Sequence, residues 1–323
     1  MDWHEGSHRG YEEGCPEKDK GGTYVTLELF GGGVLAQIGR AVAYGAVTII
    51  NAISCGLGAA LGIDLRTEAT VKLTNEPGVI GGRILSDPSE KPVLIEKVVR
   101  RVLRCFNLED KYGAYVETNS NIPIARGLKS SSAAANAIAL ATVSAIGAEA
   151  DDLAIINMGV DGSIDAGVTV TGAFDDACAS YFGNVVITDN FDRRILKIFQ
   201  PEEDYDVLIH VPSLKAYTSK SDVGRMRLIS GEVKSLHRMA LEGDYWHAMT
   251  LNGLIYSLIL GYDAKIAIDA LAAGAIASGL SGKGPAVAAV VPRDRVGEVY
   301  AAWEKYGGEI MHAKINRNKA HIL

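Results

Sequence analysis

Cysteine is scarce in this chain and is nowhere arranged to bind a metal. The four cysteines, Cys15, Cys55, Cys105 and Cys178, lie far apart in the sequence and form no C-x-x-C pair. This spacing argues against a zinc site and against a disulfide framework, and it favours reduced thiols in a cytoplasmic protein. The fold is therefore expected to rely on its apolar core, which 323 residues are enough to supply.

An excess of basic residues is also lacking, since 32 Lys and Arg stand against 39 Asp and Glu, a formal net charge of −7. Nucleic-acid-binding proteins usually carry a basic face, so no nucleic-acid partner is expected. Two uncharged runs, residues 41–63 and 130–148, approach the length that spans a bilayer. Both consist mainly of Ala and Gly rather than Leu and Phe, so neither is predicted to cross a membrane.

The first 34 residues are polar, rich in Gly and without apolar periodicity. They lack the apolar core of a signal peptide and the acid-poor character of a transit peptide. Residues 1–34 are therefore expected to be a disordered leader that folding does not need, or to follow from a start codon placed too early. Near residues 195–206 the chain changes to an acidic loop, which predicts two domains, residues 35–200 and 201–323.

Local patterns predict a mixture of helices and antiparallel strands, and so an α+β fold. Gly punctuation from Val34 to Val71 predicts short strands joined by tight turns, and alternation predicts an antiparallel strand over 62–73. Apolar spacing of three and four predicts a helix over 93–106. Further helices are expected over 151–164, 224–243, 245–260, 264–277 and 295–306, strands over 114–120, 206–211 and 286–292, and a turn followed by a strand over 175–190.

The stretch from Pro123 to Ala135 reads PIARGLKSSSAAA and combines features of a phosphate site. A helix beginning near Ser131 would offer unpaired backbone N–H groups and a partial positive charge, which suit phosphate. Gly127 permits close approach of the backbone, and serine hydroxyls are suitable oxygen ligands for Mg²⁺. Arg126 and Lys129 could oppose the charge of a triphosphate. The alternative is a helix N-cap with spare serines.

No P-loop of the form G-x-x-x-x-G-K-[ST] occurs in the chain. The nearest stretch is SGLSGKGPA, residues 278–286, in which Lys283 is followed by Gly rather than Ser or Thr. Its glycines suit close approach to phosphates or to an acceptor, and its alternative is a tight loop before the next strand. Phosphate binding in this chain would therefore use a different architecture.

Three motifs in this order resemble the GHMP small-molecule kinases: PIARGLKSSSAAA, VTVTGAFDDACAS (168–180) and SGLSGKGPAVAAVV (278–291). The second motif and GAVTIINAISCGLGAALGID (45–64) are most similar to the archaeal-type shikimate kinases. The resemblance implies a domain like the second domain of ribosomal protein S5, followed by a ferredoxin-like domain. It also implies an ATP- and Mg²⁺-dependent kinase that phosphorylates shikimate on the way to chorismate. The alternatives are a homoserine or mevalonate kinase, or a non-catalytic nucleotide-binding protein; the oligomeric state stays open.

The resemblance assigns Asp175 as the catalytic base, Ser131 as a Mg²⁺ ligand and Asp176 to the place of the family's usual Asn. The family's second acidic Mg²⁺ ligand falls on Ile164, and Asp161 is the substitute expected nearby. The resemblance assigns the following residues to ATP and phosphate: Pro123, Ile124, Ala125, Arg126, Gly127, Leu128, Lys129, Ser130, Ser131, Ser132 and Ala133. The third motif contributes Ser281, Gly282, Lys283 and Gly284.

The acceptor shikimate carries a carboxylate, for which a cationic side chain is expected. Arg40, Arg126, Lys215 and Lys283 are the candidates, and the sequence does not choose among them. Asn51, Thr171 and Asp176 are expected to contact the substrate, Asn51 and Thr171 through its ring hydroxyls.

Overall fold

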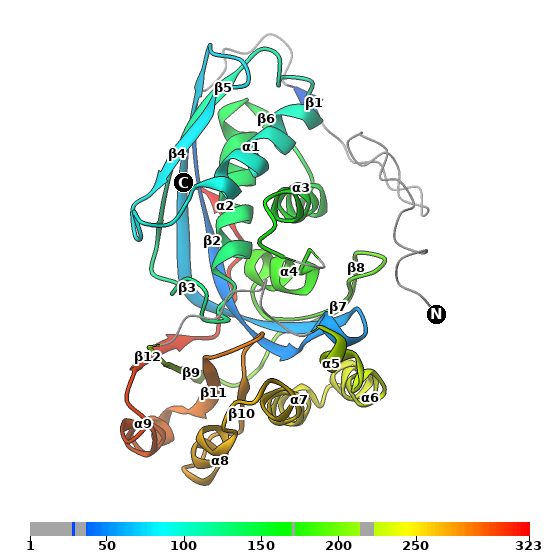
Figure 1. Ribbon diagram of the computed structural model, residues 1–323, viewed down its shortest axis with the longest axis vertical. Helices are drawn as coiled ribbons and strands as arrows, with labels where there is room; N and C mark the ends of the chain where they lie inside the picture. The colour runs from blue at the N-terminus through cyan, green and yellow to red at the C-terminus, as the bar shows by residue number, and fades with distance from the viewer. Residues whose placement is uncertain (1–27, 30–36, 170–171, 214–222) are drawn as a thin grey trace.

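The structure is a computed structural model that describes residues 28–29, 37–169, 172–213 and 223–323. Figure 1 shows a large sheet with helices α1–α4 packed on one side of it, and a smaller sheet with helices α7–α9 at one end. Antiparallel strands predominate in both sheets, so the α+β prediction is confirmed.

Two long antiparallel strands, β2 (Ile38–Ile50) and β3 (Leu57–Thr74), dominate the large sheet and are joined through a short 3-10 helix, Ala52–Ser54. The order is β13-β2-β3-β5-β4, and β7 extends it from β3 to β8. The remaining strands are β13 (His321–Ile322), β5 (Gly113–Ser120), β4 (Ile80–Ile84), β7 (Val185–Asp189) and β8 (Arg194–Phe199).

The prediction of short strands joined by tight turns over 34–71 was wrong, although the strand over 62–73 is confirmed within β3. Two glycines within the strands, Gly39 and Gly62, serve close packing instead of turns. A Cβ at Gly39 would collide with the backbone of Ala141 in α2, and one at Gly62 would lie 2.6 Å from the Cα of Gly183. Glycine in a strand commonly marks such close approach of another backbone.

Four helices cover one face of the large sheet: α1 (Val93–Cys105), α2 (Ser130–Ala145), α3 (Asp152–Asp165) and α4 (Phe174–Phe182). The helices predicted over 93–106 and 151–164 are confirmed. The turn predicted from residue 175 was wrong, because α4 occupies this stretch and packs its apolar side chains into the core; the strand that follows is β7. A two-residue strand, β6 (Ala148–Glu149), pairs with β1 (Glu28–Leu29).

The small sheet has the order β10-β11-β9-β12, formed by β10 (Ala277–Leu280), β11 (Val287–Pro292), β9 (Tyr205–Val211) and β12 (Glu309–Lys314). Its helices are α5 (Val223–Arg227), α6 (Ser230–Leu241), α7 (Tyr245–Leu260), α8 (Lys265–Ala272) and α9 (Val296–Glu304). The helix predicted over 245–260 and the strand predicted over 206–211 are confirmed in full, and the strand predicted over 286–292 is confirmed from residue 287 onward. Strands β8, β10 and β12 were not predicted.

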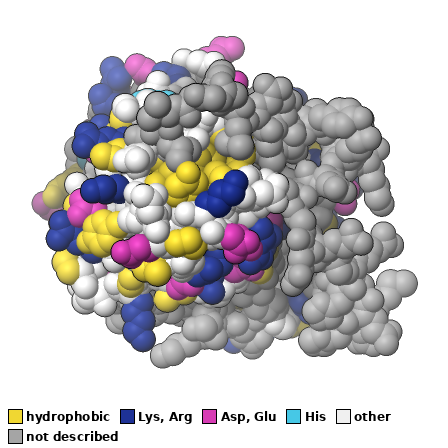
Figure 2. All heavy atoms as spheres, turned by 90° about the horizontal axis from the view of Figure 1, so that it is seen from above, with side chains coloured by type: hydrophobic (Ala, Val, Ile, Leu, Met, Phe, Trp, Pro, Cys, Tyr) yellow, Lys and Arg dark blue, Asp and Glu magenta, His cyan; other side chains and the backbone are white. Residues whose placement is uncertain are grey.

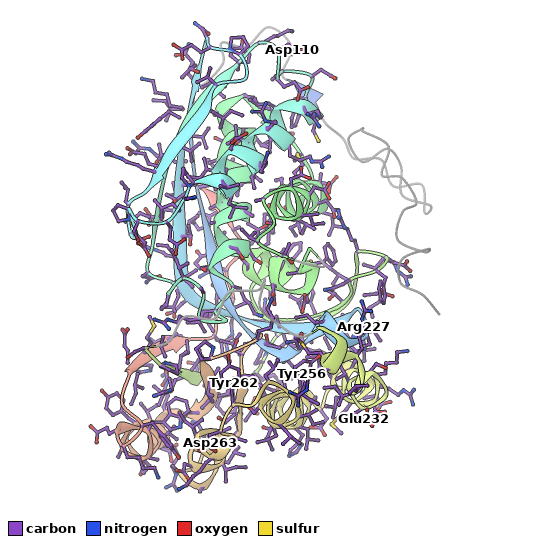
Figure 3. All side chains as sticks on the ribbon, viewed as in Figure 1. Asp110, Arg227, Glu232, Tyr256, Tyr262 and Asp263 are labelled. Carbon is purple, nitrogen blue, oxygen red and sulfur yellow. The ribbon has the colours of Figure 1, made fainter. Side chains whose placement is uncertain are left out.

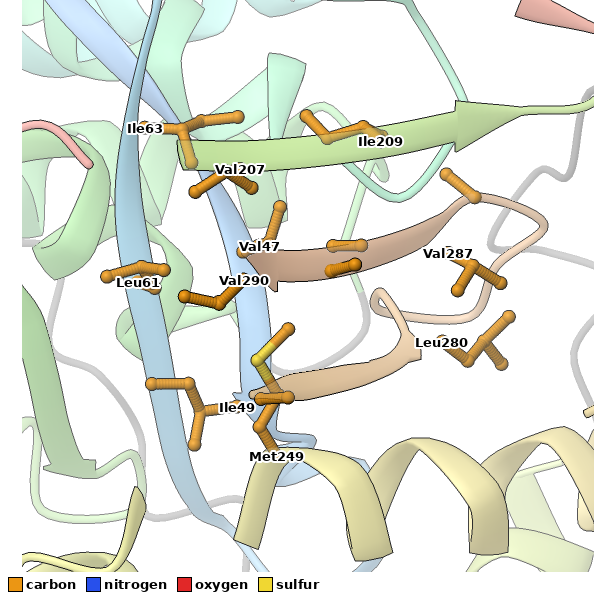
Figure 4. Packing of buried hydrophobic residues seen from close by; sticks show 14 of the residues in the cluster. Val47, Ile49, Leu61, Ile63, Val207, Ile209, Met249, Leu280, Val287 and Val290 are labelled. Carbon is orange, nitrogen blue, oxygen red and sulfur yellow. The ribbon is translucent and has the colours of Figure 1, made fainter. Parts of the chain in front are cut away.

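The two sheets share one apolar core. Figure 4 shows Val47 and Ile49 of β2 and Leu61 of β3 among side chains of the small sheet, and the same cluster includes Met249 of α7. The end of the chain returns to the large sheet, where β13 pairs with β2. The predicted boundary between residues 200 and 201 stays a prediction.

Cys55 and Cys178 are free and buried, whereas Cys105 is disulfide-bonded, so the expectation of reduced thiols was wrong for Cys105. In the described part of the chain, no helix combines the length and apolar character needed to cross a membrane. Figure 2 shows the molecule from one end, and on the part of this face that belongs to the described residues acidic and basic side chains are interspersed.

Candidate active site

A cavity of about 340 Å³, here called the central cavity, brings the three motifs together. It lies where the N-terminus of α2 meets α4, the end of β2 and the turn between β10 and β11. The lining residues are Thr48, Asn51, Ala52, Ile53, Glu90, Ile124, Ala125, Gly127, Lys129, Ser130, Ser131, Gly167, Val168, Thr169, Ala173, Asp175, Asp176, Gly282, Lys283 and Gly284.

The serine loop, residues 123–133, leads into α2 with its serines already inside the helix. The N-cap position is Lys129, whose backbone is left-handed (φ 62°) and whose side chain makes no capping hydrogen bond. None of the three serines therefore acts as the N-cap, and Ser130 and Ser131 instead line the central cavity. The free N–H groups of the first helical turn are the groups that a phosphate would accept from.

The glycine-rich turn, residues 279–284, is held against the serine loop. Ser281 Oγ donates to the carbonyl of Gly127 (2.7 Å), whose own φ is +85°. A Cβ at Gly127 would collide with the carbonyl oxygen of Ser281. Glycine is therefore required at position 127 both by its φ and by the close approach of the two loops.

The same turn is fixed to the end of β2. Gly282 N donates to Thr48 Oγ1 (2.8 Å), and Asn51 Nδ2 donates to the carbonyl of Gly282 (2.8 Å). Tyr256, labelled in Figure 3, donates from its hydroxyl to the carbonyl of Asn51 (3.1 Å). The side chain of Asn51 is thus occupied in holding the turn, although Asn51 also lines the cavity where it was expected to meet the substrate.

Asp175 lies in the first turn of α4, with 4% of its surface exposed. Asn190 Nδ2 donates to Asp175 Oδ1 (2.8 Å), and Thr188 Oγ1 donates to Asn190 Oδ1 (2.7 Å). A Cβ at Gly58 would lie 2.5 Å from Asp175 Oδ2, so this glycine makes room for the carboxylate. The carboxylate is therefore held in place from β3, β7 and the residue after β7.

Burial, and next the neighbouring Asp176 carboxylate, raise the pKa of Asp175 to about 7, while Lys129 and the Asn190 hydrogen bond oppose the rise. A carboxyl group with a pKa near 7 exchanges its proton readily at neutral pH, which is the property of an efficient general base.

Asp176 pairs with Lys129, whose Nζ lies 2.9 Å from Asp176 Oδ1. Both side chains are largely buried, at 8% exposed for Lys129 and 15% for Asp176. The two side chains form an ion pair but not a hydrogen bond, because the angles at Asp176 Oδ1 do not suit one. The ammonium of Lys129 also lies 3.1 Å from the position that a Cβ at Gly282 would take.

Several predicted residues do not line the central cavity. Asp161 lies on α3, where its carboxylate pairs with Arg193 (2.7 Å), and the structure does not bring it to the cavity. Arg126 Nη2 donates to the carbonyl of Ser213 (2.8 Å) and, with Pro123, lines a second cavity of about 460 Å³. Leu128, Ser132, Ala133 and Ser281 are buried in the surrounding structure.

Thr171 and Lys215 lie outside the described residues. Sequence patterns did not identify four further residues of the site, Thr48, Gly58, Thr188 and Asn190. Asn190 carried the clearest signal, because it is a polar residue directly after the apolar strand Val185–Asp189. Polar residues at strand ends are frequent positions for binding and catalytic groups.

Comparisons with known proteins identify the family to which the chain is similar. Residues 93–184 match the GHMP kinases N terminal domain, and residues 246–309 match the GHMP kinases C terminal family. The shikimate kinase of Methanosarcina mazei is 48% identical over 284 residues, which cover 87% of this chain and 96% of that relative. The shikimate kinase of Methanothermobacter thermautotrophicus is 40% identical over 284 residues, 86% of this chain and 96% of that relative.

Solved structures match the fold at low sequence identity. Homoserine kinase from Cytophaga hutchinsonii has a TM-score of 0.71 and 18% identity, over 90% of this chain and 99% of that chain. Mevalonate kinase from Methanococcus jannaschii has a TM-score of 0.69 and 16% identity, over 86% of this chain and 98% of that chain.

Proposed function

Because the chain belongs to the GHMP kinase family, we propose that it transfers the γ-phosphoryl group of ATP to a ring hydroxyl of shikimate, giving 3-phosphoshikimate. The shikimate kinases reported above are 40–48% identical to it over most of both chains. The product would feed the synthesis of chorismate and the aromatic amino acids. The likeness to homoserine and mevalonate kinase structures, at 16–18% identity, supports the fold alone.

The observation that carries the proposal is the buried carboxylate of Asp175 in the same cavity as the serine loop. Phosphoryl transfer requires the protein mainly to position the reactants and to neutralise charge. Asp175 would accept the proton of the attacking hydroxyl, and Asn190 would keep its carboxylate in place. A protein that only binds nucleotide has no use for such a carboxylate, so the non-catalytic alternative is disfavoured.

The nucleotide phosphates would lie at the N-terminus of α2, against the hydroxyls of Ser130 and Ser131. Helix N-termini are suited to phosphate, and this one opens into the central cavity. The glycine-rich turn supports the site by holding the serine loop through Ser281. A cytoplasmic location is part of this proposal, since ATP and the acceptor are metabolites of that compartment.

Mg²⁺ fits the donor set of the cavity, in which the Ser131 hydroxyl and the Asp176 carboxylate both supply oxygen. Among the described residues, no group of three His, Cys, Asp or Glu side chains could hold a metal ion unaided. The nucleotide would therefore bring most of the metal's ligands, as Mg²⁺ sites of kinases commonly require. When bound there, Mg²⁺ would neutralise part of the charge of the phosphates. Asp161, paired with Arg193 outside the cavity, is not supported as a ligand.

The test is ADP release by the purified protein with Mg-ATP and shikimate, homoserine or mevalonate offered separately. Turnover with shikimate alone is expected. The matched control is Asp175→Asn, whose turnover should be lower by a factor of about 10²–10⁴ while ATP binding is retained. Turnover with homoserine or mevalonate in place of shikimate would overturn the acceptor assignment. Turnover of the Asp175→Asn variant within tenfold of the unmodified protein would overturn the role of Asp175.

A further inference from the structure

Lys283 differs from Lys129, the other cationic residue that lines the central cavity, in having no partner among the described residues. It lines the cavity and is half-buried. Across the described residues, no carboxylate lies within ion-pair distance of it and no hydrogen bond engages its ammonium. Lys129, by comparison, is paired with Asp176 at 2.9 Å. A half-buried ammonium without a partner is costly unless a bound anion completes the site.

We propose that Lys283 binds the carboxylate of the acceptor and so orients its ring hydroxyl toward Asp175. This inference rests on the proposed function, which supplies an acceptor with a carboxylate. It makes Lys283 a determinant of acceptor binding, in contrast to the serine loop, which serves the nucleotide.

The other candidate cations are placed less well. Arg40 is exposed near the start of β2, eight residues from Thr48 at the cavity, which is roughly 26 Å along a strand. The guanidinium of Arg126 donates to the carbonyl of Ser213 and belongs to the second cavity. Lys215 lies outside the described residues.

The position of Lys283 suits contact with the acceptor better than contact with the nucleotide phosphates. The residue before it, Gly282, is bonded through its N–H to Thr48 and through its carbonyl to Asn51. The wall formed by Thr48, Asn51, Ala52 and Ile53 contains no charged side chain of its own. A carboxylate lying against that wall would therefore find its cation on the adjoining turn, while phosphates find N–H and hydroxyl donors at α2.

The electrostatics of the cavity agree with an anionic ligand at Lys283. Burial, and next the positive charge of Lys129, lower the pKa of Lys283 to about 8, while Asp176 opposes the shift. Lys283 is therefore still mostly protonated at neutral pH. A bound carboxylate favours this charged form, because opposite charges in contact stabilise each other.

The test is a cycle of two changes, Lys283→Met in the protein and conversion of the shikimate carboxylate to its methyl ester. With the unmodified protein, the ester should have a KM about 10- to 100-fold above that of shikimate, the loss expected for one charged hydrogen bond. Lys283→Met should raise the KM for shikimate by a similar factor and the KM for ATP by less than about threefold. The variant should not distinguish shikimate from the ester. Lys265→Met, at an exposed position on α8, is the matched control and should change neither KM.

The ratio of the KM for the ester to the KM for shikimate measures the preference for the carboxylate. The proposal would be overturned if this ratio were the same in the unmodified protein and in Lys283→Met. An effect of Lys283→Met confined to the KM for ATP would assign Lys283 to the phosphates instead. Lys283→Arg keeps the charge and should restore part of the preference, which tests the inference where Lys283→Met fails to fold. Absence of shikimate turnover in the unmodified protein would instead show that the proposed function itself has failed.

Discussion

At the scale of single residues, the burial of Asp175 links the pH dependence of catalysis to its protonation. Burial and Asp176 raise the pKa of Asp175 to about 7, so the carboxylate is protonated below this pH and cannot accept a proton. We expect kcat/KM to fall about tenfold per pH unit below pH 7. The measurement is a profile of kcat/KM from pH 5.5 to 8.5. A profile that stays flat down to pH 5.5 would contradict the assignment of Asp175 as the base.

The same carboxylate should reduce stability at neutral pH. A raised pKa means that the folded protein holds the proton more tightly than the unfolded chain, so stability falls as pH rises from about 4 to about 7. Asp175→Asn avoids the buried charge, and we expect it to raise the Tm at pH 8 by about 2–4 °C for each kcal/mol gained. The increase in Tm should become smaller toward pH 4, where the protonated Asp175 and the substituted Asn are both uncharged.

Thermal unfolding at pH 8 and pH 4 measures this effect. Asp161→Asn is the control, because Asp161 is paired with Arg193 and its loss should give no gain at either pH. A Tm for Asp175→Asn below that of the unmodified protein at pH 8 would show that the carboxylate stabilises the fold instead.

Asn190 positions Asp175, and its hydrogen bond also favours the ionised carboxylate. Asn190→Ala removes this bond, so we expect a lower kcat and an unchanged KM for ATP. We also expect the fall of kcat at acidic pH, here called the acidic limb, to begin about 0.5–1 pH unit higher than in the unmodified protein. The kcat profile of the variant against pH measures the displacement. Asn157→Ala, which loses a hydrogen bond from Arg193 instead, is the control and should leave the limb in place. A lower kcat with an undisplaced limb would reduce Asn190 to a purely structural role.

At the scale of elements, the sequence predicted the helices α1 and α7 because their boundaries and composition are locally encoded. It failed at β2, where Gly39 resembles a turn residue but permits α2 to pack closely on the strand. It failed again at β8, whose side chains are mostly exposed and give no apolar alternation. Tertiary packing decides these elements, and it does not show in local patterns.

The docking of the serine loop on the glycine-rich turn gives a prediction at this scale. Gly127→Ala places a Cβ against the carbonyl of Ser281, so we expect the two loops to separate and ATP affinity to fall at least about tenfold. Gly147→Ala is the matched control, since Gly147 also has a positive φ (+65°) but has open space around its Cβ position. Both variants carry the strain of a left-handed alanine, about 1–2 kcal/mol.

ATP titration and thermal unfolding of the two variants distinguish the effect of backbone strain from the effect of the collision with Ser281. A similar ATP affinity in both would mean that the collision at Ser281 is relieved without disturbing the phosphate site. A loss confined to Gly127→Ala would support the coupling of the two loops.

At the scale of the whole molecule, the motif residues of the candidate site could be named from the sequence, but their supporting residues and their arrangement could not. The motifs supplied Asp175, Ser131 and Lys283, all of which line one cavity. The pairing of Lys129 with Asp176 and the support of Asp175 by Asn190 join residues from different elements. Such contacts follow from the packing of the two sheets and leave no trace at short sequence separation.

The shared core predicts that the two proposed domains will not fold apart. Val47, Ile49, Leu61 and Ile63 are fully buried in the cluster that also contains the small sheet. Exposing four such side chains would cost about 1.5–3 kcal/mol each, which is comparable with the 5–15 kcal/mol that stabilises a typical domain. Residues 35–200 would also lose β13, the strand that the C-terminal part adds to β2.

We therefore expect residues 35–200 and 201–323, expressed separately, to lack cooperative thermal unfolding, and residues 35–323 to retain it together with kinase activity. The last fragment is the control, because every residue of the described core follows residue 40. A separate fragment that melts cooperatively near the Tm of the whole chain would make the junction an interface between independent domains. In that case the central cavity, which takes Asp175 from one part and Lys283 from the other, would form only when the two dock.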